Sequence, residues 1–168
     1  MKWSRWWPLV LLVALAGCGA DQVRLAKGDP APDFALPALT GDTVQLAELR
    51  GEVVAVHFWA EQCRFCEGEM RWLEEVHRRL EAEGFRLLGV NSGQDRKTVE
   101  GFVRRLEVIT FPVLLDEASK VSRRYGVIGL PTTLLLDRQG IVRHKIIGES
   151  EPAMFEAMVR ELLQASGG

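Results

Sequence analysis

The chain has 168 residues, a net charge of −2 and nearly equal numbers of acidic and basic side chains. This length accommodates one domain with a hydrophobic core and is too short for two ordinary domains. No basic field is present to attract nucleic acid, and no acidic run suggests a disordered tail. The three cysteines are an odd number, which indicates an intermolecular bridge, a free thiol or one cysteine with a separate task.

The N-terminus has the pattern of a signal peptide. Lys2 and Arg5 precede an almost unbroken apolar run over residues 8–16, which ends in Leu15-Ala16-Gly17-Cys18. A membrane-spanning helix needs about 20 residues, so a permanent transmembrane anchor is the less favoured alternative. Small residues before a cysteine resemble the processing box of bacterial lipoproteins. That resemblance implies cleavage before Cys18 and attachment of lipid to it.

We therefore predict three regions: a lipoprotein signal peptide over residues 1–17, a lipid-anchored tether over 18–30 and one domain over 31–168. A lipidated Cys18 implies a protein of the bacterial cell envelope, held on a membrane with its domain in the periplasm or otherwise outside the cytoplasmic membrane. Such compartments are oxidising, so a remaining Cys-x-x-Cys is either a fixed disulfide or a catalyst that cycles.

Hydrophobic periodicity predicts alternating strands and helices. A hairpin over residues 34–39 and 43–46 precedes a strand over 53–58 that is apolar enough to be buried on both faces. Residues 63–83 form a long amphipathic helix, with Gly84 as its stop. Further strands are expected over residues 85–90, 112–115, 132–136 and 141–147, the last two joined by a tight turn. Asp95 opens a second helix, residues 121–125 form a short one, and Ser150 caps the last. This order indicates an α/β fold whose mixed sheet is covered on both faces.

Cys63 and Cys66 lie where the buried strand turns into the long helix. The unpaired N–H groups and positive dipole end of a helix N-terminus stabilise a thiolate at Cys63, with Cys66 one turn inside. Arg64 adds a cation that lowers the pKa of the Cys63 thiol further. Cys63 is therefore the expected nucleophile.

Two alternatives to redox chemistry remain at this pair. A structural disulfide is the first, although a ring of this size contributes only about 2 kcal/mol against about 3 for a fifteen-residue loop. A metal site is the second, with ligands from the cysteines and from His57, His77 or His144. No second cysteine pair exists and no two histidines have ligand spacing, so we predict no metal.

The motifs resemble those of the TlpA/ResA-like thiol-disulfide oxidoreductases, an AhpC/TSA-redoxin-like group of the thioredoxin-like superfamily. The resemblance covers the chain from about residue 31 onward. The matching segments are Ala31-Pro32-Asp33-Phe34, Phe58-Trp59-Ala60, Cys63-x-x-Cys66, Gly126-Val127-x-Gly129-Leu130-Pro131-Thr132-Thr133 and Asp137-Arg138-x-Gly140. It implies a thioredoxin-like fold, a mixed central sheet flanked by helices, with an N-terminal β-hairpin and a central insertion. It calls for no cofactor.

The resemblance also implies roles for residues around the pair. Pro131 follows a cis peptide bond beside the redox-active disulfide, Leu130 offers its backbone to a client, and Trp59 belongs to the substrate-binding surface. Glu69 tunes the cysteine pKa values and exchanges the proton of the buried thiol. The alternative for Glu69 is an ordinary solvated side chain. Gln62 stands where relatives carry Trp, which removes part of the usual docking rim.

His57 departs from the family pattern, because it takes the inward place that thioredoxin fills with Asp. A buried, neutral core histidine is the favoured interpretation. The alternative is a proton acceptor for Cys66.

The expected activity is reduction of disulfides in exported proteins. By resemblance, a DsbD- or CcdA-like membrane protein supplies electrons and apocytochrome c is a client. The direction of electron flow stays open at this point, since an oxidase or isomerase would use the same residues. Two rival functions also remain: a peroxiredoxin-type thiol peroxidase, suggested by residues 31–34, and a copper-handling module that uses the cysteines with His144.

Overall fold

The computed structural model describes residues 25–106 and 108–165. The predicted signal peptide and Cys18 lie outside these residues. Within the part that is described, no helix is long and apolar enough to cross a membrane.

Seven strands form two sheets. The small sheet is the antiparallel pair of β1 (Ala35–Pro37) and β2 (Thr43–Gln45), the hairpin that the sequence predicts. The main sheet has the order β5-β4-β3-β6-β7, in which β3 pairs parallel to β4 and antiparallel to β6. Its strands are β3 (Val53–Trp59), β4 (Phe85–Ser92), β5 (Val113–Asp116), β6 (Thr132–Leu136) and β7 (Val142–Ile147). The expected mixed sheet is confirmed.

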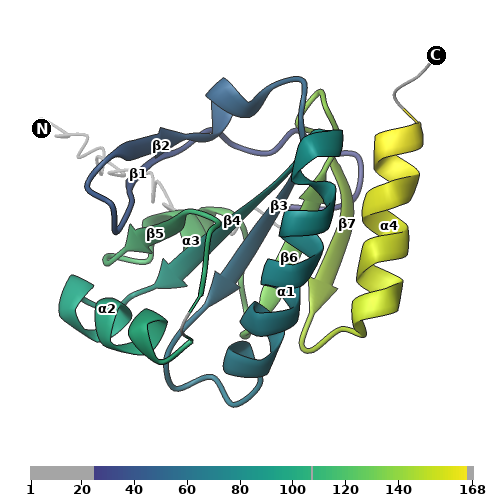
Figure 1. Ribbon diagram of the computed structural model, residues 1–168. Helices are drawn as coiled ribbons and strands as arrows, with labels where there is room; N and C mark the ends of the chain where they lie inside the picture. Colours follow the sequence, from purple (N-terminus) through teal and green to yellow (C-terminus); the bar gives the residue numbers. More distant parts are fainter. Residues whose placement is uncertain (1–24, 107, 166–168) are drawn as a thin grey trace, which may run out of the picture.

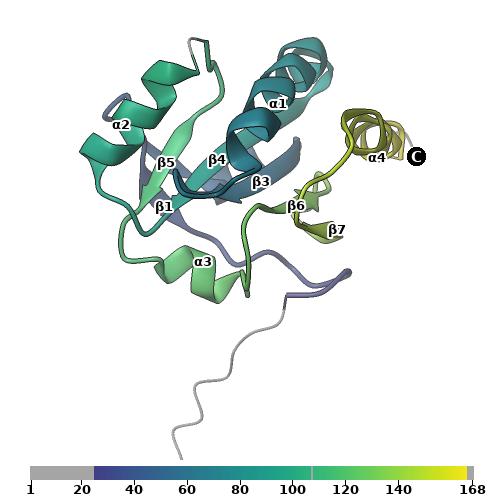
Figure 2. The same cartoon turned by 90° about the horizontal axis from the view of Figure 1, so that it is seen from below.

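Helices cover both faces of the main sheet (Figures 1 and 2). On one face lie α1 (Cys66–Leu80) and α4 (Pro152–Gln164), and on the other lies the short α3 (Lys120–Arg124). The helix α2 (Arg96–Arg105) connects β4 to β5, and two short 3-10 helices span Leu46–Leu49 and Glu81–Glu83. The α2–β5 unit, inserted between β4 and α3, is the expected central insertion.

The central strand β3 divides the hydrophobic core into two clusters. All of its residues are buried, because α1 and α4 cover one face and α3 with the N-terminal hairpin covers the other. Side chains alternate along a strand. Val53, Ala55 and Trp59 accordingly join the cluster under α1, whereas Val54 and Phe58 join the cluster with Tyr125 of the opposite face.

The start of the described chain runs along the N-terminal end of β7. Gly28 N donates a 2.8 Å hydrogen bond to Val142 O, Val142 N donates to Asp29 O, and Leu25 is 4% exposed. Part of the segment that the sequence assigns to the tether therefore lies against the domain. This contact is at the Val53 end of the sheet, since Leu136 pairs with both Val142 and Val54.

Two details of the prediction are wrong. The long helix begins at Cys66, so Cys63 lies before it and Cys66 is not one turn inside. No strong capping side chain precedes the helix: Phe65 occupies the N-cap and gives no side-chain hydrogen bond. Ser150 does not cap α4, because Glu151 holds that position and Pro152 opens the helix.

Candidate redox site

Cys63 and Cys66 form a disulfide at the N-terminal end of α1, with 5.4 Å between their Cα atoms. A turn joins them, in which Cys66 N donates a 3.2 Å hydrogen bond to Cys63 O. Cys66 is fully buried and Cys63 is partly exposed. A client sulfur can therefore approach Cys63 but not Cys66, which agrees with the unequal roles that the sequence predicts for them.

A polar network braces the loop that leads into Cys63. Gln94, just after β4, accepts 2.8 Å hydrogen bonds at Oε1 from Glu61 N and from Asn91 Nδ2, and its Nε2 donates to Gln62 Oε1 at 3.0 Å. The Arg105 guanidinium of α2 adds a 2.8 Å ion pair to Glu61. Sequence reasoning missed Gln94, because a polar residue in a connection carries no signal of such long-range contacts.

Glu69 is buried one turn after Cys66 on the same helix, with 2% of its surface exposed. Oε1 accepts a 2.9 Å hydrogen bond from the Ser150 hydroxyl, and Oε2 has no hydrogen-bond partner among the described residues. Burial raises the pKa of the Glu69 carboxyl to about 7, against the opposing effect of hydrogen bonds from Ser150. The alternative of a solvated glutamate is wrong.

His57 is fully buried in β3. Its Nδ1 lies 2.9 Å from Thr133 Oγ1 on β6, and its Nε2 has no hydrogen-bond partner among the described residues. Burial lowers the pKa of His57 to about 3, so the ring is neutral at ordinary pH. This matches the interpretation of His57 as a neutral core histidine.

The peptide bond between Leu130 and Pro131 is cis, as the resemblance implies. Leu130 is half-buried, and its side chain packs against the same core cluster as Cys63. Within the described chain the main-chain N–H and C=O of Leu130 make no hydrogen bond.

Trp59 does not reach the surface. It is 0% exposed and its ring stacks on Phe102 of α2, with centroids 4.7 Å apart. The prediction that Trp59 belongs to the substrate-binding surface is therefore wrong. Trp59 instead supports the site from inside the core.

Two exposed apolar side chains lie in the segments that carry the site. Phe65, between the cysteines, is 43% exposed, and Ile128, just before the cis peptide bond, is 82% exposed. The Arg64 guanidinium lies over the Phe65 ring, 5.5 Å from its centroid. Phe65 and Ile128 thus provide exposed apolar surface, which the polar Gln62, at the position where relatives carry Trp, does not provide.

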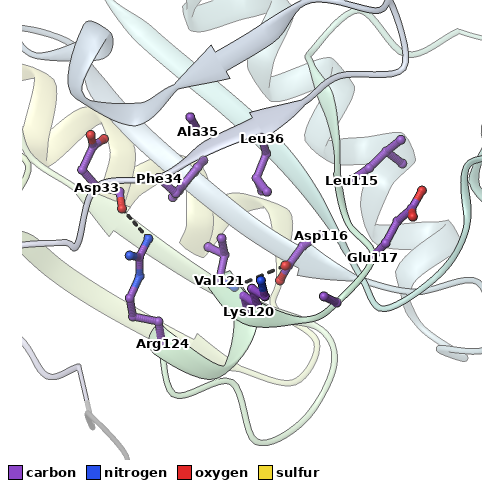
Figure 3. Close-up of a pocket in the computed structure, with 11 residues that line it drawn as sticks. Asp33, Phe34, Ala35, Leu36, Leu115, Asp116, Glu117, Lys120, Val121 and Arg124 are labelled. Carbon is purple, nitrogen blue, oxygen red and sulfur yellow. Dashed lines mark hydrogen bonds between the residues drawn. The ribbon is translucent and has the colours of Figure 1, made fainter.

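A pocket of about 610 Å³ lies on another part of the molecule, between the N-terminal hairpin, the end of β5 and α3 (Figure 3). Its polar groups are largely used internally: Arg124 donates to Asp33 O, and Asp116 accepts from Val121 N and from both Ser122 N and Oγ. Neither cysteine lines this pocket. In the described ranges no group of three His, Cys, Asp or Glu side chains is placed to hold a metal ion.

Comparison with known proteins gives the family. The AhpC/TSA family model matches residues 27–145, which is more than half of the chain. The chain belongs to the AhpC/TSA family. Curated relatives include "Thiol-disulfide oxidoreductase ResA" of Geobacillus thermodenitrificans, 36% identical over 148 residues that cover 83% of this chain and 84% of the relative. ResA of Bacillus anthracis is 31% identical, with 87% and 84% covered.

Solved structures of other proteins have a similar fold. A crystal structure described as the thiol:disulfide interchange protein DsbE of Chlorobium tepidum is 37% identical with a TM-score of 0.76, covering 85% of this chain and 99% of that one. A solution structure of a protein described as a disulfide isomerase from Bacteroides thetaiotaomicron is 27% identical, also with a TM-score of 0.76, over 83% and 91%. With its Cys63–Cys66 disulfide, this AhpC/TSA protein is a thiol-disulfide oxidoreductase of the ResA/DsbE type.

Proposed function

We propose that this protein reduces disulfides of exported proteins in the bacterial cell envelope, with Cys63 as the nucleophile. The observation that carries the proposal is the unequal burial of the pair: Cys63 is partly exposed and Cys66 is fully buried. A thiolate at Cys63 lies before the first turn of α1, where the helix dipole and unpaired N–H groups favour negative charge.

The exchange proceeds in two steps. The Cys63 thiolate attacks one sulfur of a client disulfide, forms a mixed disulfide and releases the first client thiolate. Cys66 then loses its proton and attacks the Cys63 sulfur, which re-forms the Cys63–Cys66 disulfide and releases the second client thiolate. Two electrons pass to the client, and the enzyme is oxidised.

Glu69 receives the Cys66 proton in this scheme. A carboxyl with a pKa of about 7 can take up and release a proton near neutral pH. Glu69 follows Cys66 by one helical turn, and Oε2 has no competing hydrogen bond among the described residues. Leu130, beside the cis-Pro131 bond, holds the client by its free backbone groups.

The proposed cellular setting rests on the sequence motifs and on the family resemblance. Residues 1–17 direct export, Cys18 carries the lipid, and a DsbD- or CcdA-type membrane protein returns the enzyme to its reduced form. Apocytochrome c, whose haem site contains a cysteine pair, is the client that the resemblance to the TlpA/ResA-like oxidoreductases implies.

The direction of electron flow is tested by a redox titration of the full chain. A reductase is expected to have a reduction potential close to that of thioredoxin, about −270 mV. A reduction potential close to that of DsbA, about −120 mV, would overturn the reductase assignment in favour of an oxidase. The matched variant Cys63→Ser is expected to abolish reduction of a disulfide peptide, and retained turnover in it would exclude Cys63 as the nucleophile.

A further inference from the structure

Ser150 lies in the short connection between β7 and α4, and its hydroxyl donates a 2.9 Å hydrogen bond to Glu69 Oε1 across 81 positions of sequence. Both residues are buried, at 5% and 2% exposed. A serine just before a helix ordinarily caps it. Here Glu151 takes the N-cap position, and the Ser150 hydroxyl is used for Glu69 instead.

This contact makes the two oxygens of Glu69 unequal. Oε1 is engaged by Ser150, whereas Oε2 is buried without a hydrogen-bond partner in the described part of the chain. A proton taken up at Oε2 leaves the bond from Ser150 intact. A proton at Oε1 would compete with it.

The same connection also contacts the cis-proline segment. Gly148 N donates a 2.8 Å hydrogen bond to Pro131 O, and Gly148 has φ 89°, in the left-handed region that favours glycine. The stretch 148–150 therefore bonds to Pro131 at one end and to Glu69 at the other, which fixes the position of Ser150 relative to the redox site.

Few other charges act on Glu69. Glu149, beside Ser150, raises the pKa of the Glu69 carboxyl by like-charge repulsion. On α4, the Glu156 carboxylate is paired with Arg79 and Arg160. On the face of β3 that α1 covers, His57 is neutral.

We propose that Ser150 is a positioning residue for proton transfer from Cys66, holding Glu69 so that Oε2 is the oxygen that exchanges the proton. This rests on the proposed function, in which Cys66 resolves the mixed disulfide. The proton leaves Cys66 Sγ for Glu69 Oε2, and the electron pair that stays on sulfur forms the bond to Cys63.

The first test needs no turnover. An infrared titration of the oxidised full chain follows the band of protonated carboxyl groups, and the component lost in Glu69→Gln belongs to Glu69. Ser150→Ala removes a hydrogen-bond donor that stabilises the Glu69 carboxylate. The infrared titration midpoint of Glu69 is therefore expected to rise by about 0.5–1 pH unit in this variant. Ser150→Thr, which keeps the hydroxyl, is expected to restore it. Ser122→Ala is the matched control, because it removes a similar buried bond to Asp116.

The second test follows the resolving step. A mixed disulfide between Cys63 and a peptide is formed, and release of the peptide thiol is measured against pH. The midpoint in Ser150→Ala is expected to move upward by the same amount as the infrared midpoint, with Ser122→Ala unchanged. Ser150→Gly provides the same loss of the hydroxyl if the alanine variant does not fold.

Two results would overturn the proposal: an unchanged infrared midpoint in a folded Ser150→Ala or Ser150→Gly protein, or a shifted infrared midpoint with an unshifted resolving step. Failure of the proposed function looks different. The wild-type chain would then release no peptide thiol at any pH, while the infrared titration would still report on the contact between Ser150 and Glu69.

Discussion

Gln94 Nε2 donates a 3.0 Å hydrogen bond to Gln62 Oε1, which links the end of β4 to the residue before Cys63. The same side chain accepts a hydrogen bond from Glu61 N, so one glutamine holds two consecutive residues of the loop. Its own backbone N–H donates to Oδ1 of the fully buried Asn91. The nucleophile is thus placed by the core through Asn91 and Gln94.

Gln94→Ala is expected to slow the attack of Cys63. The substitution removes the hydrogen bonds of the Gln94 side chain, and one net bond is worth about 1 kcal/mol, or about 5-fold in rate. The single-turnover rate of the reduced chain with a small aromatic disulfide measures this. Gln139→Ala is the control, at an exposed glutamine of the β6–β7 turn. Equal rates for both variants would show that the network does not position Cys63.

His57 is expected to make the fold acid-sensitive. In the unfolded chain it binds a proton below about pH 6.5, whereas in the folded chain it stays neutral down to about pH 3. The unfolded state therefore binds more protons in this window, and stability is lost as pH falls through it. Relative to His57→Gln, the wild type is expected to lose about 2 kcal/mol between pH 7 and pH 5. Denaturant unfolding at both pH values measures this difference. Parallel pH dependence in the two proteins would contradict the burial of a neutral ring.

Glu69 is expected to give the wild-type fold the opposite pH dependence, which Glu69→Gln removes. The folded pKa of Glu69 is raised from 4.5 to about 7, so the folded state binds more protons in that window and stability is lost as pH rises through it. At pH 8 the Gln variant is expected to be more stable than the wild type by roughly 2–3 kcal/mol. The exposed Glu67→Gln on the same helix serves as the control, and it should change stability by less than about 0.5 kcal/mol. A Gln variant no more stable than wild type at pH 8 would rule out a penalised Glu69 charge.

Gly89→Ala is expected to disturb the support beneath the site. A methyl group there would lie 2.8 Å from Phe111 Cε2 and 3.5 Å from Trp59 Nε1, inside the packed core. Overpacking of this kind costs about 1–3 kcal/mol. Gly101→Ala on α2 is the matched control, since its methyl group meets no atom within 4 Å and alanine favours the helix. Chemical denaturation compares the two. An unaltered midpoint for Gly89→Ala would contradict the close packing of Phe111.

The strands and most helices could be predicted because each has a local signal. The β3 run is apolar throughout since both faces are buried, and Asp95 was predictable as the start of α2, where its side chain accepts from Thr98 N. The residue at which α1 begins could not be predicted, because neither Cys63 nor Phe65 is a strong capping residue.

Whether a carboxylate of α1 is buried or exposed depends on residues far away in the sequence. The sequence therefore did not show which of these glutamates are buried. Glu69 and Glu74 are buried, whereas Glu67 and Glu75 are exposed. The buried carboxylates accept hydrogen bonds, Glu69 from Ser150 and Glu74 twice from Thr110. Their spacing on the helix alone does not reveal these partners. For the same reason Ser150 was predicted to be a cap.

The most direct test of Cys63 as the attacking residue is covalent trapping. The reduced full-length Cys66→Ser chain is mixed with a peptide that contains one disulfide, and the adduct is mapped by mass spectrometry. A stable mixed disulfide at Cys63 is the predicted result, with none in the Cys63→Ser chain. An adduct formed at Cys66 in the Cys63→Ser chain, at a rate equal to that of the Cys66→Ser chain, would contradict the assignment.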